Sequence, residues 1–170
     1  MDEEKLISLI TERLTRREKA RLNLLCQENF RPTPVPDKRV FFDYHYIGLI
    51  QVPIQLIHDL YYFEKEPWID WLLTGISYQV QFVFDLSEQT LAFVPWKMLT
   101  QWPIDFHVAG KTVVACKKKT IKREDLLLLE EGSLLVKTNQ QKVTAEAFEL
   151  IQRKKIKIQE RIDEACIWGK

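Results

Sequence analysis

Apolar residues near the N-terminus recur at the spacing of an amphipathic helix. The recurring residues are Leu6, Ile7, Leu9, Ile10 and Leu14. At about 100° per residue they fall within one broad stripe, while the opposite side of the helix is polar. Asp2 can cap the helix, and Glu3 and Glu4 then lie in the first turn, where negative charge favours the helix dipole. The pattern predicts an N-terminal helix within residues 1–18.

The segment 19–39 is expected to be a linker with a proline-rich end. Two local structures are open at its start, because the helix can continue to Cys26 or the stretch from Leu22 to Leu25 can form a short strand. The prolines at positions 32, 34 and 36 then break any regular element. The linker is expected to separate the helix from a globular domain over residues 40–170.

Alternating strands and helices are predicted in that domain. The predicted strands lie at residues 39–52, 78–84, 104–108 and 112–116, with short strands at 133–138, near 143 and at 156–158. The predicted helices lie at residues 53–63, 68–74, 88–100, 123–129 and 145–154. Ser87 and Thr144 are expected N-caps, and Gly75 is expected to close its helix. This order predicts an α/β (mixed α+β) fold, a single compact domain with a mixed sheet, preceded by the amphipathic helix.

Composition and charge narrow the classes of function. The chain has 170 residues, of which 46% are hydrophobic and 29% charged, as is typical of a folded globular protein. Its 25 basic and 24 acidic residues nearly balance, so charge gives no argument for a nucleic-acid partner. No apolar run approaches the roughly 20 residues that span a bilayer, and the acidic N-terminus has the wrong sign for a secretion signal. We therefore expect a cytoplasmic protein with neither a nucleic-acid nor a membrane partner.

The sequence contains no recognisable catalytic or metal-binding motif. Its 5 glycines are too dispersed for a dinucleotide or phosphate loop. Each histidine lies near an aspartate, in the pairs Asp43 with His45, His58 with Asp59, and Asp105 with His107. Such pairs occur in metal sites and acid–base pairs, but their spacing fits no metal motif, and structural histidines held by hydrogen bonds are commoner. We expect no catalytic residue, metal or cofactor, and we expect reduced, mostly buried cysteines at positions 26, 116 and 166.

The N-terminal helix is the remaining functional feature, and two interpretations apply to it. The helix either packs its stripe on its own domain or docks on a partner. Burial supplies about 1.5–3 kcal/mol per fully buried side chain before entropic costs, which is enough for weak, reversible docking. Multiple copies in one assembly strengthen such docking.

Three segments together carry a resemblance to a known family. The first is the stripe of the N-terminal helix. The second comprises residues 71–76, 80–82, 93–99 and 102–104, and the third comprises residues 121–126, Leu129, Gly132, 143–144 and Ala147. In this order they resemble the PduM family, proteins of the propanediol-utilisation bacterial microcompartment. The resemblance covers residues 6–158, although Ala145 and Lys155 stand where the family commonly has proline and glycine.

The resemblance implies a structural or assembly role in a microcompartment rather than catalysis. The first helix is then similar to encapsulation helices, so the partner-docking residues are the stripe, and the partners are shell proteins or encapsulated enzymes. The competing hypothesis is an enzyme or enzyme accessory of the same compartment, handling a cofactor such as cobalamin. A deep pocket with converging polar groups near His45, Asp43 or His107 would favour that alternative. The direct partner and the oligomeric state are left open.

Overall fold

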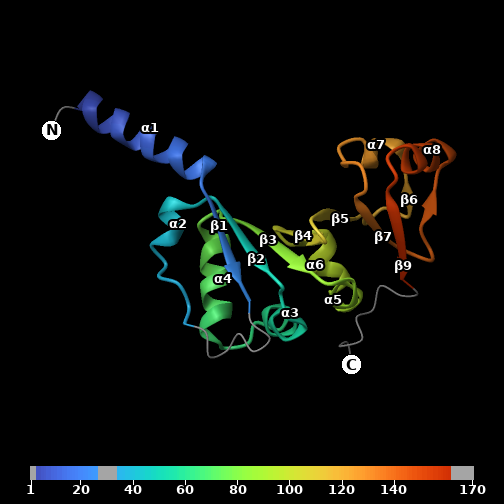
Figure 1. Ribbon diagram of the computed structural model, residues 1–170, viewed down its shortest axis with the longest axis horizontal. Helices are drawn as coiled ribbons and strands as arrows, with labels where there is room; N and C mark the ends of the chain where they lie inside the picture. The colour runs from blue at the N-terminus through green and yellow to red at the C-terminus, as the bar shows by residue number, and fades with distance from the viewer. Residues whose placement is uncertain (1–2, 27–33, 162–170) are drawn as a thin grey trace. The chain divides into compact units, whose positions relative to one another are not determined.

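The computed structural model describes residues 3–26 and 34–161 (Figure 1). The predicted cap Asp2 and the residue Cys166 lie outside the described residues. The chain divides into two compact units, Met1–Phe84 and Asp85–Lys170. Each unit contains helices and strands of its own, and the two are described in turn.

A parallel sheet flanked by helices forms the first unit. Its elements are α1 (Glu3–Lys19), β1 (Arg21–Leu25), α2 (Val40–Asp43), β2 (Tyr46–Ile50), α3 (Ile54–Tyr61), α4 (Pro67–Ser77) and β3 (Gln81–Leu86), the last two residues of which belong to the second unit. β2 pairs with β1 on one side and β3 on the other, with Ile47 opposite both Leu22 and Phe82. In Figure 1, α1 extends away from the sheet beyond the start of β1.

An aromatic cluster fills the core of the first unit. The indole of Trp71 on α4 lies 4.8 Å from the ring of Phe41 and 5.8 Å from that of Phe82, measured between centroids. All three rings are buried. Gly75 allows this packing, because a Cβ atom at that position would lie only 2.5 Å from Cζ of Phe82. Gly75 therefore lies inside α4 and does not close it, which corrects the expected helix end at residue 74.

The second unit contains a mixed sheet. Its elements are α5 (Glu88–Phe93), α6 (Trp96–Gln101), β4 (Ile104–Val108), β5 (Lys111–Ala115), β6 (Thr120–Ile121), α7 (Arg123–Leu126), β7 (Leu134–Thr138), β8 (Lys142–Val143), α8 (Ala145–Arg153) and β9 (Lys157–Arg161). β4 and β5 form an antiparallel hairpin, whereas β5 with β7 and β7 with β9 are parallel. The short strands β6 and β8 form a separate parallel pair.

One buried and one half-buried polar side chain fix the loops of the second unit. The amide Nε2 of Gln141 donates to the carbonyls of Cys116 and Lys118, both at 2.6 Å, and its Oε1 accepts from Thr138 N at 2.9 Å. The guanidinium of Arg161 donates to the carbonyls at the end of α5, including Leu91 O at 2.6 Å. The bonds of Gln141 thus hold the backbone after β5, and those of Arg161 hold the end of α5.

The carboxylate of Asp125 stabilises the start of α7. It accepts from Lys122 N at 2.9 Å and forms an ion pair with Lys118 Nζ. The hydrogen bond from Lys118, followed by the one from Lys122, lowers the pKa of Asp125 below the ordinary value of an aspartate. The folded state therefore favours the ionised carboxylate.

Several sequence predictions are confirmed by these elements. The fold is α/β with a mixed sheet, and an amphipathic helix precedes it. Ser87 and Thr144 cap α5 and α8, since their side chains accept from Thr90 N and Ala147 N. β4 coincides with the strand predicted at residues 104–108, and its hairpin with β5 turns at residues 109–110.

Of the two local structures left open at the start of the segment 19–39, the strand is the one that forms, because Leu22 to Leu25 belong to β1. Other predictions are corrected. The predicted strand over residues 39–52 begins as the helical turn α2, and only Tyr46–Ile50 is extended. The strand predicted from residue 78 begins at Gln81, and the helix predicted over residues 123–129 ends at Leu126.

Replacing Gly75 by alanine tests the tight contact between α4 and β3. The added methyl group overlaps the buried ring of Phe82, and overpacking of this kind costs about 1–3 kcal/mol. The higher helix propensity of alanine stabilises the variant by about 1 kcal/mol and offsets part of that cost. We expect Gly75→Ala to lower the free energy of unfolding by up to about 2 kcal/mol in urea denaturation. Ser77→Ala, at an exposed position of the same helix, is the matched control and should change it little. A gain in stability for Gly75→Ala would contradict the close packing.

Asp125→Asn tests the ion pair at the start of α7. Because the pKa of Asp125 is lowered in the folded state, its stabilising effect is complete above the ordinary pKa of an aspartate and is lost as the pH falls through the folded-state pKa. We expect the variant to be less stable by about 1 kcal/mol at neutral pH and to converge with the native chain in acid. Melting temperatures measured from neutral to acidic pH check this. A constant difference at every pH would refute it, and Glu149→Gln, at an exposed position of α8, is the control.

Candidate functional site

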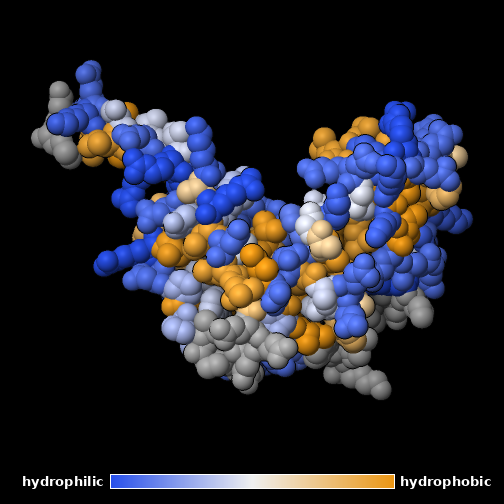
Figure 2. Space-filling model, viewed as in Figure 1, coloured by the Kyte–Doolittle hydropathy of each residue, from blue (hydrophilic) through white to orange (hydrophobic). Residues whose placement is uncertain are grey.

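The stripe of α1 is exposed to solvent. No residue of this helix is buried, and the stripe side chains retain 41% exposure at Leu6, 57% at Ile7, 50% at Leu9, 50% at Ile10 and 53% at Leu14. Figure 2 shows hydrophobic residues of α1 at the surface, next to hydrophilic ones. Of the two interpretations of the helix, close packing of the stripe on its own domain is therefore wrong.

Arg17 anchors the last turns of α1 to the first unit. Its Nε donates to Phe41 O at 2.8 Å, and its Nη2 donates to Tyr78 O at 2.9 Å. Its own carbonyl accepts from His45 N at 3.1 Å. The anchor therefore joins α1 to α2, to the residue after α4 and to the start of β2, which fixes the direction in which the helix leaves the sheet.

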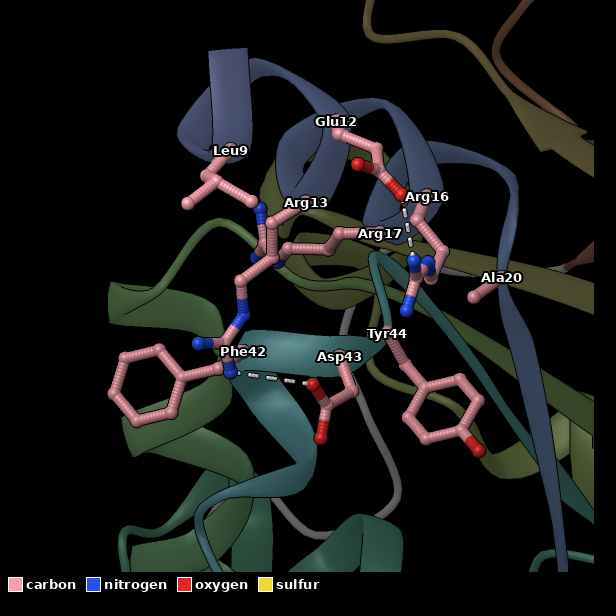
Figure 3. Close-up of a pocket in the computed structure, with 9 residues that line it drawn as sticks. All are labelled: Leu9, Glu12, Arg13, Arg16, Arg17, Ala20, Phe42, Asp43 and Tyr44. Atoms are coloured by element: carbon pink, nitrogen blue, oxygen red, sulfur yellow. Dashed lines mark hydrogen bonds and ion pairs between the residues drawn. The ribbon is translucent and has the colours of Figure 1, made fainter. Parts of the chain in front are cut away.

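A charged groove lies between α1 and α2. It has a volume of about 690 Å³ and is lined by Leu9, Glu12, Arg13, Arg16, Arg17, Ala20, Phe42, Asp43 and Tyr44. In Figure 3, Arg13 reaches from α1 toward Asp43 on α2, and the atoms Nη2 and Oδ1 lie 3.4 Å apart. Arg16 pairs with Glu12 on the helix itself at 2.9 Å. Both pairs are largely exposed, so each contributes little to stability.

An apolar groove adjoins the stripe. It has a volume of about 330 Å³ and is lined by Ile10, Arg13, Leu14, Arg17, Phe41, Phe42 and Tyr78. The rings of Phe42 and Tyr78 meet edge to face, with centroids 5.4 Å apart, and remain 48% and 46% exposed. The apolar surface of α1 thus continues onto the body of the first unit.

The histidine–aspartate pairs lie on different elements. Asp43 lines the charged groove, whereas His45 Nδ1 is buried and has no hydrogen-bond partner among the described residues. His58 Nδ1 lies 3.0 Å from Asp59 Oδ1 on α3, and His107 belongs to β4 of the second unit. Within residues 3–26 and 34–161, no group of three or more histidine, cysteine, aspartate or glutamate residues is placed to hold a metal ion.

The two cysteines among the described residues are not activated nucleophiles. Burial raises the pKa of the Cys26 thiol to about 11. Burial also raises the pKa of Cys116, and the nearby Asp125 carboxylate adds to that effect. At neutral pH both thiols are protonated, and a protonated thiol is a poor nucleophile. Both are free of disulfides, as expected.

Two features of the surface were missed by sequence reasoning. Phe42 and Tyr78 were assigned to strands, so their part in the apolar groove was not foreseen.

In the second unit, Leu128 is 97% exposed beside Leu127 at 50%, and Lys154 Nζ donates to Leu127 O at 2.6 Å. Figure 2 shows hydrophobic residues at the surface near α7. The run of leucines over residues 126–129 could have predicted these exposed side chains, since a single short turn cannot bury every member of such a run.

Comparison with known proteins places the chain in a family. Residues 5–157 match the PDU_like family, described as "Putative propanediol utilisation". The match covers most of the chain, and the chain belongs to this family. The curated proteins and the solved structures yielded no match. The protein is thus related to propanediol utilisation.

A separate observation concerns membranes. Within the described parts of the chain, each helix is too short or too polar to cross a bilayer.

Arg17→Ala tests the anchor. The substitution removes two hydrogen bonds from a charged donor to backbone carbonyls, so we expect the free energy of unfolding to fall by about 1–3 kcal/mol. Amide hydrogen exchange in the last turn of α1 should also become faster. Arg16→Ala, which removes only an exposed pair with Glu12, is the matched control. Equal effects of the two substitutions would show that Arg17 is not an anchor.

Proposed function

We propose that this protein is a non-catalytic assembly protein of a bacterial microcompartment, within the cytoplasm, and that it links shell proteins and encapsulated enzymes through α1. The observation that carries the proposal is the exposed stripe on a helix with no buried residue. An exposed apolar surface of this kind marks a binding site for another protein. Family membership supplies the setting, since the family is described by propanediol utilisation.

The attachment of α1 supports docking. Arg17 holds the last turns of the helix, while the stripe begins at Leu6 and ends at Leu14, ahead of the anchor. A helix presented in this way is preorganised in direction, so binding requires less ordering of the chain. The adjoining apolar groove provides a second wall against which a partner can pack.

The free energy available from the stripe suits reversible docking. The stripe side chains are about half exposed, so covering them supplies roughly 1 kcal/mol each. After the cost of association a single contact is weak. An assembly that holds many copies converts weak contacts into stable incorporation through effective concentration.

The finer assignment is to the PduM type of protein. It is supported by the three sequence segments described above and by the family match over residues 5–157. The alternative, an accessory that handles a cofactor such as cobalamin, requires polar groups that converge in a deep pocket. The grooves beside α1 are instead open and lined by apolar or ion-paired side chains, which favours docking.

Ile10→Asp tests docking. An aspartate in the middle of the stripe places a charge in the buried centre of the proposed contact, so we expect association with isolated microcompartments to weaken roughly tenfold or more. Because Ile10 is half exposed, the melting temperature should change little. The measurements are co-sedimentation with microcompartments and thermal unfolding of the purified protein.

Ser8→Asp is the matched control for this experiment. It adds the same charge to the same helix, on the polar face away from the stripe, and should leave co-sedimentation unchanged. Equal co-sedimentation of both variants and the native chain would refute docking through the stripe. A large loss of melting temperature for Ile10→Asp alone would instead assign α1 to the core. These substitutions retain Arg17, which a deletion of residues 1–17 would remove.

A further inference from the structure

We propose that α1 pairs with α1 of a second copy of this chain, in antiparallel orientation. The pair is related by a two-fold axis, and the N-terminal half of each helix lies along the apolar groove of the other copy. This inference goes beyond the proposed function, because it concerns the purified protein and requires no shell protein or enzyme. Three observations carry it.

The first observation is that the apolar surface is self-complementary: the stripe of one copy fits the apolar groove of the other. The stripe occupies the N-terminal part of α1, and the apolar groove lies beside its C-terminal part. Within the stripe, Ile7, Ile10 and Leu14 follow the alternating spacing of three and four residues by which paired helices interlock. In an antiparallel pair, the stripe of each helix covers Ile10 and Leu14 of the other and reaches the exposed rings of Phe42 and Tyr78.

The second observation is the distribution of charge along α1. The first turn carries Glu3 and Glu4, and the last turn carries Arg16, Arg17 and Lys19. An antiparallel pair brings the acidic turn of each copy to the basic turn of the other, twice by symmetry. It also aligns the helix dipoles favourably. A parallel pair would bring acid to acid and base to base.

The third observation is that basic groups border the apolar groove. Arg13 and Arg17 line it, whereas Arg16 and Lys19 lie on the polar face with Ser8. Arg17 is used by its bonds to Phe41 O and Tyr78 O. Arg13 forms an ion pair with Asp43 whose side chains are 68% and 60% exposed. Exposed pairs of this kind exchange partners easily, so Arg13 can bind a glutamate of a second copy.

The contact is small, because each copy contributes one short helix and the rim of a groove. Interfaces at the low end of the size range are transient. We therefore expect a dimer that dissociates on dilution, with a dissociation constant on the order of 10 µM.

Sedimentation equilibrium of the full-length chain over a wide range of concentration tests the pairing. The native chain should pass from monomer to dimer, and Ile10→Asp should remain monomeric. Ser8→Asp should dimerise as the native chain does. A native chain that is monomeric throughout, or a dimer that Ile10→Asp leaves intact, would overturn the proposal.

A charge exchange tests the orientation. One variant carries Glu3→Lys with Glu4→Lys, and the other carries Arg13→Glu, at the edge of the apolar groove. Each alone should dimerise roughly tenfold more weakly than the native chain, because like charges then meet at both ends of an antiparallel pair. Mixed together they should form a heterodimer at least as stable as the native dimer. A parallel pair would leave each variant alone close to native, and that result would overturn the antiparallel arrangement.

Failure of this inference is distinguishable from failure of the proposed docking. A monomeric protein that still co-sediments with microcompartments through Ile10 refutes the pairing and leaves docking intact. A dimer that fails to co-sediment refutes docking and leaves the pairing intact. Circular dichroism of each variant confirms that α1 is still helical.

Discussion

The bonds of the Arg17 guanidinium to two backbone carbonyls determine how this protein exposes α1 and its stripe. They join α1 to Phe41 on α2 and to Tyr78 after α4. The attachment uses only the last turns of the helix, so the preceding turns carry the stripe in solvent. A single short helix is marginal in water when nothing holds it. Here the anchor, and not burial of the apolar face, fixes where the helix points.

The aromatic core of the first unit positions the partners of that anchor. Phe41 packs its ring against Trp71, and its carbonyl accepts from Arg17. Gly75 lets the ring of Phe82 approach α4, which ends just before Tyr78. Packing inside the unit and presentation of the helix outside it are therefore coupled through α2 and α4. A disturbance of this cluster is transmitted to the apolar groove through Phe42 and Tyr78.

The proposed docking and the proposed pairing use the same surface. A copy whose stripe is covered by a second copy has no stripe to offer to a shell protein or an enzyme. The two contacts are thus mutually exclusive at each helix, and their balance depends on the concentration of free protein and on the number of docking sites. Under these proposals, the dimer keeps the stripe covered until a partner of higher effective concentration displaces the second copy.

The sequence by itself determined the local features. The spacing of residues 6–14 defined the helix and its stripe, and Ser87 and Thr144 defined helix starts, because periodicity and capping involve residues close in the chain. Only the tertiary structure decided that Phe41 turns inward on a helical segment, since Trp71 contacts it from another element. It likewise placed Gly75 inside α4, because the ring of Phe82 requires the space there. Only the tertiary structure likewise showed that the stripe is exposed, because the exposure of a residue depends on every distant part of the chain that packs against it.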